Sequence, residues 1–303
     1  MAKANGGRGW RGAALAALLA LALACAGLAL NAGVVRLRRA SIASPDLPQA
    51  FDGVRVLFLS DFHVNWSSSP DRAAALVMDL QPLRPDLLLL GGDYTNADPW
   101  VDRDDELAAR ERFFLRIADF QAPLGKFGVA GNHDVKLDRA VGVDLADAMA
   151  LGGVTLLRNS SATIERGGQS IALIGLDDWT EGAQAPRDVA GRADVGDYTI
   201  VLSHTPDALP PLVNQPAQGG ARWIDLMLCG HLHGGQVRLM GWSPIVPSIY
   251  GDRFLSGWYD EGGAALLVSN GVGALYLPIR LGAEPQAHLI EIRRAAGRPR
   301  EEA

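Results

Sequence analysis

The sequence predicts an α/β fold in which two mixed β-sheets pack together and helices flank them, a four-layer sandwich. In the first half of the chain, short apolar runs alternate with helical patterns, which is typical of parallel strands joined by crossover helices. In the second half, strand-like runs follow one another with few helices between them. The chain has 303 residues, of which 48% are hydrophobic, so it can bury a large core.

Five apolar runs each lead into a turn that contains Asp, Asn or His. These runs are Val54–Ser60, Leu87–Leu90, Phe127–Ala130, Thr199–Ser203 and Leu226–Cys229. Strands of one sheet that deliver such side chains at the same end build a shared polar site at its rim. We therefore expect the five runs to be strands whose ends meet at a functional site.

Three helices are expected among these strands. Ser69 suits an N-cap and Pro70 the first helical position of a helix that continues through Ala73–Leu80. A second helix within Asp98–Phe120 begins with acidic residues, which indicate a solvated helix start rather than a metal cluster. A third helix is expected at Leu145–Leu151.

The remaining strands are expected mainly in the second half, where Gly167-Gly168 predicts a hairpin turn. They are Val154–Leu157, Ala162–Glu165, Ile171–Leu176, Gln236–Leu239, Ala264–Ser269 and His288–Ile292. The second half of the chain is therefore expected to add mostly β structure.

Residues 1–35 are interpreted as an N-terminal membrane anchor or signal segment. Ala13–Leu30 is an unbroken run of Ala, Leu, Cys and Gly, and it is about long enough to cross a ~30 Å hydrocarbon core. A cleaved signal peptide is the alternative, but its apolar region usually spans only ~7–15 residues, so an uncleaved transmembrane helix is favoured. Three basic residues on each side leave the side of the membrane open.

The rest of the chain is divided into a juxtamembrane linker at 36–51, a globular domain at 52–294 and a flexible tail at 295–303. The net charge of −6 gives no reason to expect nucleic-acid binding. The two cysteines, Cys25 and Cys229, do not form a disulfide framework. The sequence does not indicate an oligomeric state.

The five turns carry eight side chains that suit metal binding or proton transfer: Asp61, His63, Asp93, Asn132, His133, His204, His231 and His233. Each motif alone is weak, because Asp and Asn are common in turns and a lone histidine is more often structural. Five of the six histidines in the chain fall in these turns, however, which argues against coincidence. The set is large enough for two metal ions that share a ligand.

The order of these motifs resembles the calcineurin-like metallophosphoesterase superfamily. The matching motifs are Asp61-x-His63, Gly92-Asp93, Gly131-Asn132-His133-Asp134, His204 and Gly230-His231-x-His233. The segments Leu202–Asp207, Cys229–Gln236 and Pro278–Arg280 further resemble a bacterial membrane-associated or exported, phosphodiesterase-like branch. The resemblance covers about Asp52 to Arg293, although Val64-Asn65-Trp66 stands where the family usually has a glycine.

The resemblance implies two groups of metal ligands that share a bridging carboxylate. The first group is Asp61, His63 and His233, the second is Asn132, His204 and His231, and Asp93 bridges them. His133 would be the general acid for the departing oxygen, and Asp134 would orient it. The implied cofactors are two divalent or trivalent ions, and the ligand types suit Mn, Fe or Zn without choosing among them.

The implied function is that of a membrane-tethered phosphoesterase that hydrolyses a phosphodiester, phosphomonoester or pyrophosphate bond. A membrane tether makes a lipid-linked or sugar-nucleotide substrate plausible, and a UDP-linked diacylated sugar is one option by analogy. The alternative is a non-catalytic, membrane-tethered metal- or phosphate-binding module, which would have no need for His133. A metal-dependent peptidase is disfavoured because the sequence lacks a His-Glu-x-x-His motif.

Other side chains have a structural interpretation beside a functional one. Arg280 is assigned either to phosphate contact or to an ion pair. For Asp177-Asp178 a polar turn is favoured over support of the metal ligands, and His288 is assigned a structural role. For a group of aromatic residues, packing is favoured over an apolar rim for a lipid substrate or the membrane interface. These residues are Trp242, Tyr250, Trp258 and Tyr259.

Overall fold

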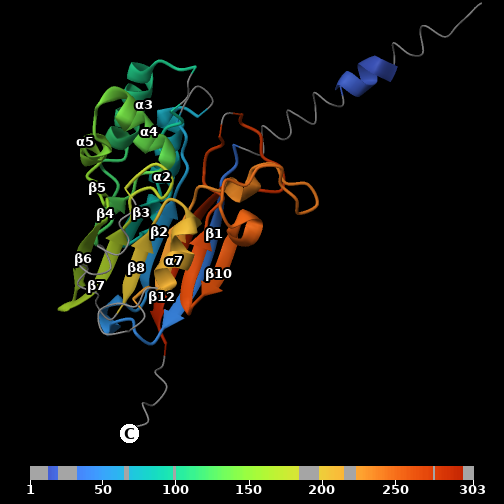
Figure 1. Ribbon diagram of the computed structural model, residues 1–303. Helices are drawn as coiled ribbons and strands as arrows, with labels where there is room; N and C mark the ends of the chain where they lie inside the picture. The colour runs from blue at the N-terminus through green and yellow to red at the C-terminus, as the bar shows by residue number, and fades with distance from the viewer. Residues whose placement is uncertain are drawn as a thin grey trace, which may run out of the picture.

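The computed structural model describes residues 13–19, 33–64, 68–97, 100–183, 198–214, 223–275 and 277–295. In this part of the chain, two six-stranded sheets pack together and helices lie outside them (Figure 1). One buried cluster lies between the sheets, and two further clusters join each sheet to the helices outside it. The prediction of two mixed sheets flanked by helices is therefore confirmed.

The first sheet has the strand order β1-β12-β2-β3-β4-β5. Its strands are β1 (Arg36–Ser44), β2 (Val54–Leu59), β3 (Leu87–Leu90), β4 (Lys126–Gly128), β5 (Thr155–Leu156) and β12 (Gln286–Arg294). Strands β2 to β5 are parallel, whereas β12 runs antiparallel to β2. The four parallel strands therefore end at one edge, as the alternating pattern of the first half predicts.

The second sheet has the strand order β10-β11-β9-β8-β7-β6. Its strands are β6 (Ser160–Arg166), β7 (Gln169–Gly175), β8 (Thr199–Leu202), β9 (Leu226–Cys229), β10 (Gly257–Glu261) and β11 (Ala264–Val268). The four central strands are parallel and the two edge strands are antiparallel to their neighbours. The hairpin turn predicted at Gly167-Gly168 joins β6 to β7, and both glycines have positive φ.

The helices follow the signals at their starts. They are α2 (Pro70–Asp79), α3 (Arg103–Arg116), α4 (Asn132–Val141), α5 (Leu145–Leu151) and α7 (Leu209–Val213), with short 3₁₀ turns η1 (Gln49–Phe51), η2 (Gln81–Leu83), η3 (Pro206–Ala208), η4 (His233–Gly235) and η5 (Gly251–Phe254). The Ser69 side chain accepts a hydrogen bond from the Arg72 backbone N–H, which confirms the predicted N-cap of α2. Asp102 caps α3 in the same way.

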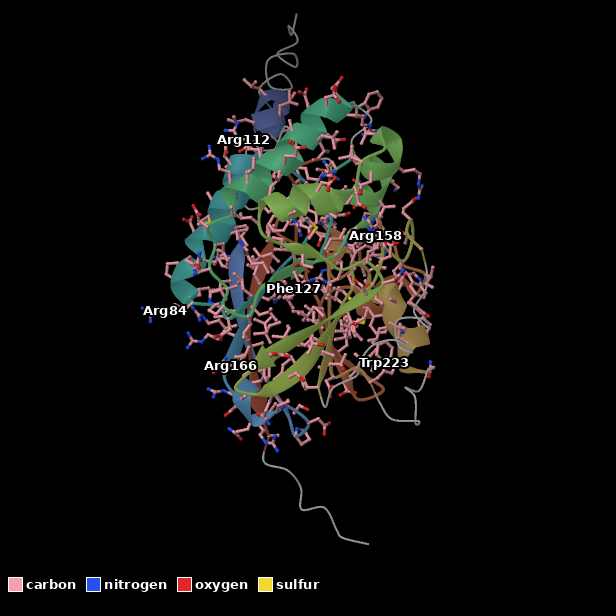
Figure 2. All side chains as sticks on the ribbon, turned by 90° about the vertical axis from the view of Figure 1, so that its left-hand side faces the viewer. Arg84, Arg112, Phe127, Arg158, Arg166 and Trp223 are labelled. Atoms are coloured by element: carbon pink, nitrogen blue, oxygen red, sulfur yellow. The ribbon has the colours of Figure 1, made fainter. Side chains whose placement is uncertain are left out.

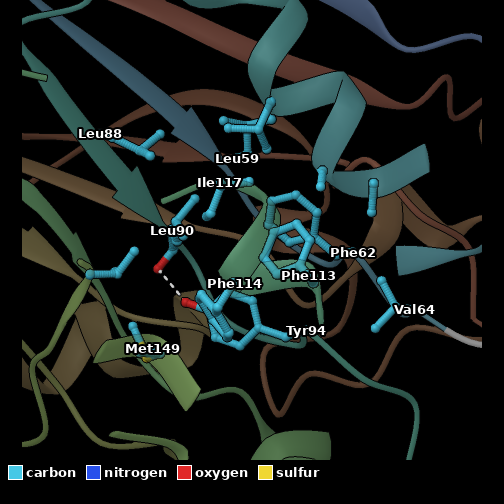
Figure 3. Packing of buried hydrophobic residues seen from close by; sticks show 14 of the residues in the cluster. Leu59, Phe62, Val64, Leu88, Leu90, Tyr94, Phe113, Phe114, Ile117 and Met149 are labelled. Atoms are coloured by element: carbon cyan, nitrogen blue, oxygen red, sulfur yellow. Dashed lines mark hydrogen bonds between the residues drawn. The ribbon is translucent and has the colours of Figure 1, made fainter. Parts of the chain in front are cut away.

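Aromatic side chains fill the space between the first sheet and its helices (Figure 3). Phe62, Tyr94 and Phe113 pack with ring centroids 4.7–6.2 Å apart, and all three are fully buried. Arg84 and Arg112, in contrast, lie at the surface of the molecule (Figure 2). Phe62 and Tyr94 follow Asp61 and Asp93 in the chain, so this packing fixes the position of two turns.

Two sequence interpretations are corrected by the structure. The linker predicted at 36–51 instead contains β1, which pairs in parallel with β12 over nine residues, and η1. The exposed arginines of β1 make this edge strand resemble a polar linker in the sequence, because only one face of an edge strand is covered. The strand predicted at Gln236–Leu239 is reduced to single bridges, from Val237 to Leu281 and from Leu239 to Trp242.

The membrane-anchor prediction for Ala13–Leu30 lies mostly outside the described residues. Residues 13–19 are helical and exposed. Among the residues that the structure describes, we find no helix with the length and hydrophobicity required to span a bilayer. The anchor therefore stays a prediction.

Candidate metal centre

The five metal-bearing turns come together, but their strands belong to both sheets rather than to one. Strands β2, β3 and β4 of the first sheet and β8 and β9 of the second end at this place. Hydrogen bonds connect the turns directly: the Asp61 N–H donates to the Gly92 carbonyl at 2.9 Å, and the His231 N–H donates to Asp61 Oδ1 at 2.9 Å. The centre therefore lies where the two sheets meet.

The first set of side chains, which we call the Asp61 group, consists of Asp61, His63 and His233. All three are buried, and one potential ligand atom of each lies within 4.8 Å of the others. His63 Nε2 lies 2.9 Å from His233 Nε2, and Asp61 Oδ1 lies 3.6 Å from His233 Nε2. One oxygen and two nitrogens at this spacing can converge on a single cation.

The second set, the Asp93 group, consists of Asp93, His204 and His231. Its potential ligand atoms also lie within 4.8 Å of one another, and its members are buried. Asp93 Oδ2 lies 3.2 Å from His204 Nε2, and His204 Nε2 lies 3.1 Å from His231 Nδ1. This group can hold a second cation.

Asp93 lies between the two groups. Its Oδ2 is 3.2 Å from His204 Nε2 and 3.6 Å from His63 Nε2, so one carboxylate reaches both. Asn132 Oδ1 is buried and has no hydrogen-bond partner among the described residues. A buried amide oxygen is rarely left unpaired, and a metal ligand would explain it. The residues present fit a binuclear metal centre.

The backbone of the turns is strained where the ligands are. Five of the predicted ligands have positive φ although none is glycine: Asp61, His63, Asp93, His231 and His233. Such conformations cost free energy and persist where the surrounding structure enforces them, often at functional sites. Neighbouring glycines permit the close approach, since a Cβ at Gly131 would clash with Asp93 and one at Gly230 with Asp61.

Burial prepares most of the imidazoles for metal binding. It lowers the pKa of His63 to about 3 and that of His231 to about 4, so both rings are neutral at pH 7. Burial also lowers the pKa of His233 well below its usual value. Burial acts in the same direction on His204, but there the Asp93 carboxylate prevails and holds the pKa well above its usual value. His204 must therefore release a proton when a cation binds.

The carboxylates respond to the same surroundings. Burial raises the pKa of Asp61 to about 6. Burial would raise the pKa of Asp93 as well, but His204 and His133 hold it well below its usual range. The carboxylate between the two groups is therefore the one that stays ionised most firmly.

His133 contacts the centre without belonging to either group. Its backbone N–H donates to Asp93 Oδ1 at 2.9 Å, and its ring meets the His63 ring edge-on with centroids 5.3 Å apart. Its Nδ1 is hydrogen-bonded to the carbonyl oxygen of Asn96. That carbonyl requires a proton on Nδ1, so Nε2 is the nitrogen left for exchange with another molecule.

Asp134 does not contact the His133 ring as the sequence interpretation expects. Its carboxylate accepts backbone hydrogen bonds from Asp93 at 2.7 Å, Tyr94 at 3.0 Å and Gly131 at 3.0 Å. Burial, with Asp93 nearby, raises its pKa to about 7. Asp134 therefore fixes the backbone of Asp93, and its place at the third position of α4 is the capping signal that could have predicted this.

Arg280 has a role that neither sequence interpretation describes. The side chain is fully buried, and its guanidinium donates to the carbonyls of Gly273, His233 and Ala283. Its Nη2 also lies 3.0 Å from His233 Nδ1. Burial lowers its pKa to about 10, so it remains a cation at pH 7. Arg280 therefore fixes both the backbone and the ring of His233 through its contacts with the carbonyl and with Nδ1.

The other candidates lie away from the centre or serve the fold. Asp178 accepts hydrogen bonds from Thr180 and Glu181, which confirms a polar turn. His288 Nε2 lies 3.1 Å from Ser269 Oγ in the core, as expected of a structural residue. The aromatic residues divide: Tyr250 and Tyr259 pack on the second sheet, whereas Trp242 and Trp258 are exposed.

Comparisons with known proteins agree with this geometry. The family described as calcineurin-like phosphoesterase matches residues 54–235. The metallophosphoesterase YkuE of Bacillus subtilis (strain 168) is 29% identical over 248 residues, which cover 81% of each chain. The phosphodiesterase YaeI of Escherichia coli (strain K12) is 31% identical over 252 residues, 78% of this chain and 82% of that one.

A vertebrate relative is also similar. A protein of Danio rerio named as a transmembrane protein with a metallophosphoesterase domain is 24% identical over 299 residues, which cover 94% of this chain and 64% of that protein.

Proposed function

The chain belongs to the calcineurin-like phosphoesterase family and is a metal-dependent phosphoesterase with a binuclear metal centre, and we propose that its substrate is a phosphodiester or pyrophosphate. The observation that carries the proposal is the single carboxylate of Asp93 between two buried ligand groups. The similarity to the phosphodiesterase YaeI supports a diester over a phosphomonoester. A non-catalytic module would have no use for the orientation of His133.

We assign one metal ion to the Asp61 group and the other to His204, His231 and Asn132, with Asp93 shared. When bound, two such ions supply a nucleophile from water near neutral pH and neutralise charge on the phosphoryl oxygens. The chain contributes a rigid cradle, since Asp134 fixes the Asp93 backbone and Arg280 fixes His233. Rigid placement of this kind lowers the reorganisation that the reaction requires.

His133 is assigned as the general acid. The Asn96 carbonyl holds Nδ1, so a proton on Nε2 is the one that can pass to the departing oxygen. The backbone bond from His133 to Asp93 keeps the imidazole beside the shared carboxylate. This placement favours protonation of an oxygen that leaves the phosphorus, as ester hydrolysis requires.

A membrane tether through Ala13–Leu30 and a lipid-linked or sugar-nucleotide substrate complete the proposal. The tether is supported by the length of the apolar run and by the similarity to the Danio rerio relative, which is named a transmembrane protein. A bond in a lipid-linked phosphate lies near the bilayer surface, where a tethered enzyme would reach it. A UDP-linked diacylated sugar is the concrete substrate to assay.

The test is hydrolysis by the full chain, purified in detergent and supplied with Mn²⁺. Bis(p-nitrophenyl) phosphate, a UDP-sugar and a UDP-linked diacylated sugar are compared, with Asp93→Asn as the inactive control. Turnover of the diester by the wild-type chain and not by the variant is expected. Absence of metal-dependent turnover on all three substrates would refute the substrate proposal. p-Nitrophenyl phosphate is assayed beside them, and hydrolysis of this monoester alone would replace the diester with a monoester.

A further inference from the structure

We propose that the segment Val237–Ile249, which we call the apolar loop, docks on a lipid bilayer beside the metal centre. Five large apolar side chains of this loop are mostly exposed: Leu239 at 62%, Met240 at 100%, Trp242 at 68%, Ile245 at 73% and Ile249 at 76%. Soluble surfaces rarely gather so many apolar side chains in one short segment. The loop also contains no acidic residue.

The apolar loop is ordered, so its exposed side chains are displayed by the fold. Leu239 and Trp242 exchange backbone hydrogen bonds of 2.9 and 3.0 Å and close a two-residue hairpin. Met240 and Gly241 occupy its tip, and both have positive φ as such a turn requires. At the base, Ser243 Oγ donates to the Gly235 carbonyl at 2.8 Å.

The far end of the apolar loop is attached to the metal centre. His231 Nε2 donates to the Pro247 carbonyl at 3.1 Å, while its Nδ1 faces His204. The Ile249 N–H and the Ser248 hydroxyl both donate to Asp207, at 2.9 and 2.5 Å. A surface bound by this loop would therefore lie close to the two ligand groups.

The apolar loop also lies at the end of the molecule where the chain leads into β1 (Figure 1). Its first residue, Val237, forms a β-bridge with Leu281. Leu277, four residues before Leu281, is also exposed. A cavity of about 220 Å³ is lined by Pro278, the residue after Leu277, and by Gly33 and Val35, which lie directly before β1. The predicted anchor and the loop would thus meet the same surface.

The charges around the apolar loop suit an anionic bilayer. Arg238 lies within it, and Arg36 and Arg38 lie at the start of β1, where both face Glu284 at 3.7 and 3.0 Å. A tryptophan and long aliphatic side chains with arginine at the rim are typical of segments that lie at a membrane interface. A second protein copy would instead require a broad complementary face, whereas a two-residue hairpin tip is narrow.

The test places an environment-sensitive NBD fluorophore at the tip by Met240→Cys in the full chain, with Cys25→Ser to remove the cysteine that lies outside the described residues. Cys229 is buried and stays unlabelled. The matched control is Leu115→Cys, an exposed apolar position on α3 between the charged residues Arg112 and Arg116. An unchanged midpoint of thermal unfolding for both labelled chains, compared with the unlabelled chain, checks that the fold is intact.

The labelled chains are reconstituted into vesicles of phosphatidylcholine and phosphatidylglycerol that contain a spin-labelled lipid. We expect at least about twofold stronger quenching at position 240 than at position 115, since interfacial segments sit ~5–10 Å deep. Equal quenching would overturn the proposal. A signal at position 240 that changes with the density of protein in the vesicles would also overturn it, because the occupant would then be another copy of the chain.

The outcome is independent of the proposed function. Flotation of the chain with vesicles tests the anchor, and hydrolysis tests the enzyme, whereas the fluorophore reports only on the apolar loop. A chain that floats and hydrolyses the ester but leaves position 240 in water would retain the proposed function and refute the docking.

Discussion

The two halves of the metal centre are braced in different ways. In the Asp93 group, backbone carbonyls hold the rings: Gly91 accepts from His204 at 2.8 Å, and Pro247 accepts from His231 at 3.1 Å. In the Asp61 group, side chains do so: Arg280 contacts His233, and Ser60 donates to Asp61 at 2.5 Å. A single substitution can therefore remove the contact that holds the His233 ring, whereas the contacts that hold the His204 and His231 rings are made by the main chain.

The largest effect is expected from the residue that both groups share. Asp93→Asn removes a charge from both groups, and we expect turnover to fall about 1000-fold or more, because each ion supplies several kcal/mol in the transition state. Elemental analysis should show that both metal ions bind more weakly. Asp61→Asn is the matched control, since it should weaken one ion and leave the other bound. Equal loss in the two variants would contradict the sharing.

His133 should separate proton transfer from metal binding. We expect His133→Gln to retain both metal ions and to lower kcat about 100- to 10,000-fold on an ester with a poor leaving group such as an alkoxide. The loss should be much smaller on bis(p-nitrophenyl) phosphate, because p-nitrophenolate leaves without a proton. The measurement is kcat on both esters at saturating Mn²⁺. Equal losses on both esters would remove the assignment as general acid.

The contrast between the two kinds of brace is tested at Arg280. Lysine keeps the charge but cannot form the planar fork that reaches several carbonyls, so Arg280→Lys should weaken one metal site about 10- to 100-fold. Metal titration followed by calorimetry should show one weakened and one unchanged site. Arg110→Lys is the matched control, since Arg110 is equally buried but pairs with Asp138 at 2.7 Å. Weakening in both variants would indicate a general loss of stability.

The smallest effect concerns a buried histidine outside both groups. Burial lowers the pKa of His288 to about 4, whereas in the unfolded chain it lies near 6.5, so below pH 6.5 the unfolded state binds more protons. The part of the free energy of unfolding that depends on His288 is therefore constant above pH 6.5 and falls as the pH drops, by about 1 kcal/mol at pH 5.5. His288→Gln should flatten that part of the profile of urea unfolding. An unchanged pH profile would show that the pKa of His288 is the same in the folded and the unfolded chain.

The sequence predicts the centre of the site better than its supports. The ligands are local features, because each follows a buried strand by two to four residues, and their convergence within each sheet follows from parallel pairing. Arg280 contacts a ligand 47 residues away in sequence, and no local pattern encodes that contact. Proximity in sequence predicts a contact between Asp134 and the His133 ring, whereas helix geometry points the carboxylate back to Gly131.

The fold shows the same division. Strands with a fully buried apolar run, such as β3 and β9, match their predicted bounds. Strand β1 was missed because its partner β12 lies about 250 residues later and its outer face is charged. The pair Gly131-Asn132 is common in turns and therefore predicts a turn. In the structure, Asn132 instead begins the helix α4.

The pairing of β1 with β12 has a mechanical consequence. The two strands are parallel and in register from Arg36↔Gln286 to Ser44↔Arg294, so their first residues lie at one end and their last residues at the other. Tension applied to the chain ahead of Arg36 would load every hydrogen bond of this ladder in shear, at the same time. A sheared ladder resists force better than one that unzips bond by bond. A chain pulled from its N-terminus along the axis of β1 would in this way transmit the load to the whole sheet without peeling its edge strand away.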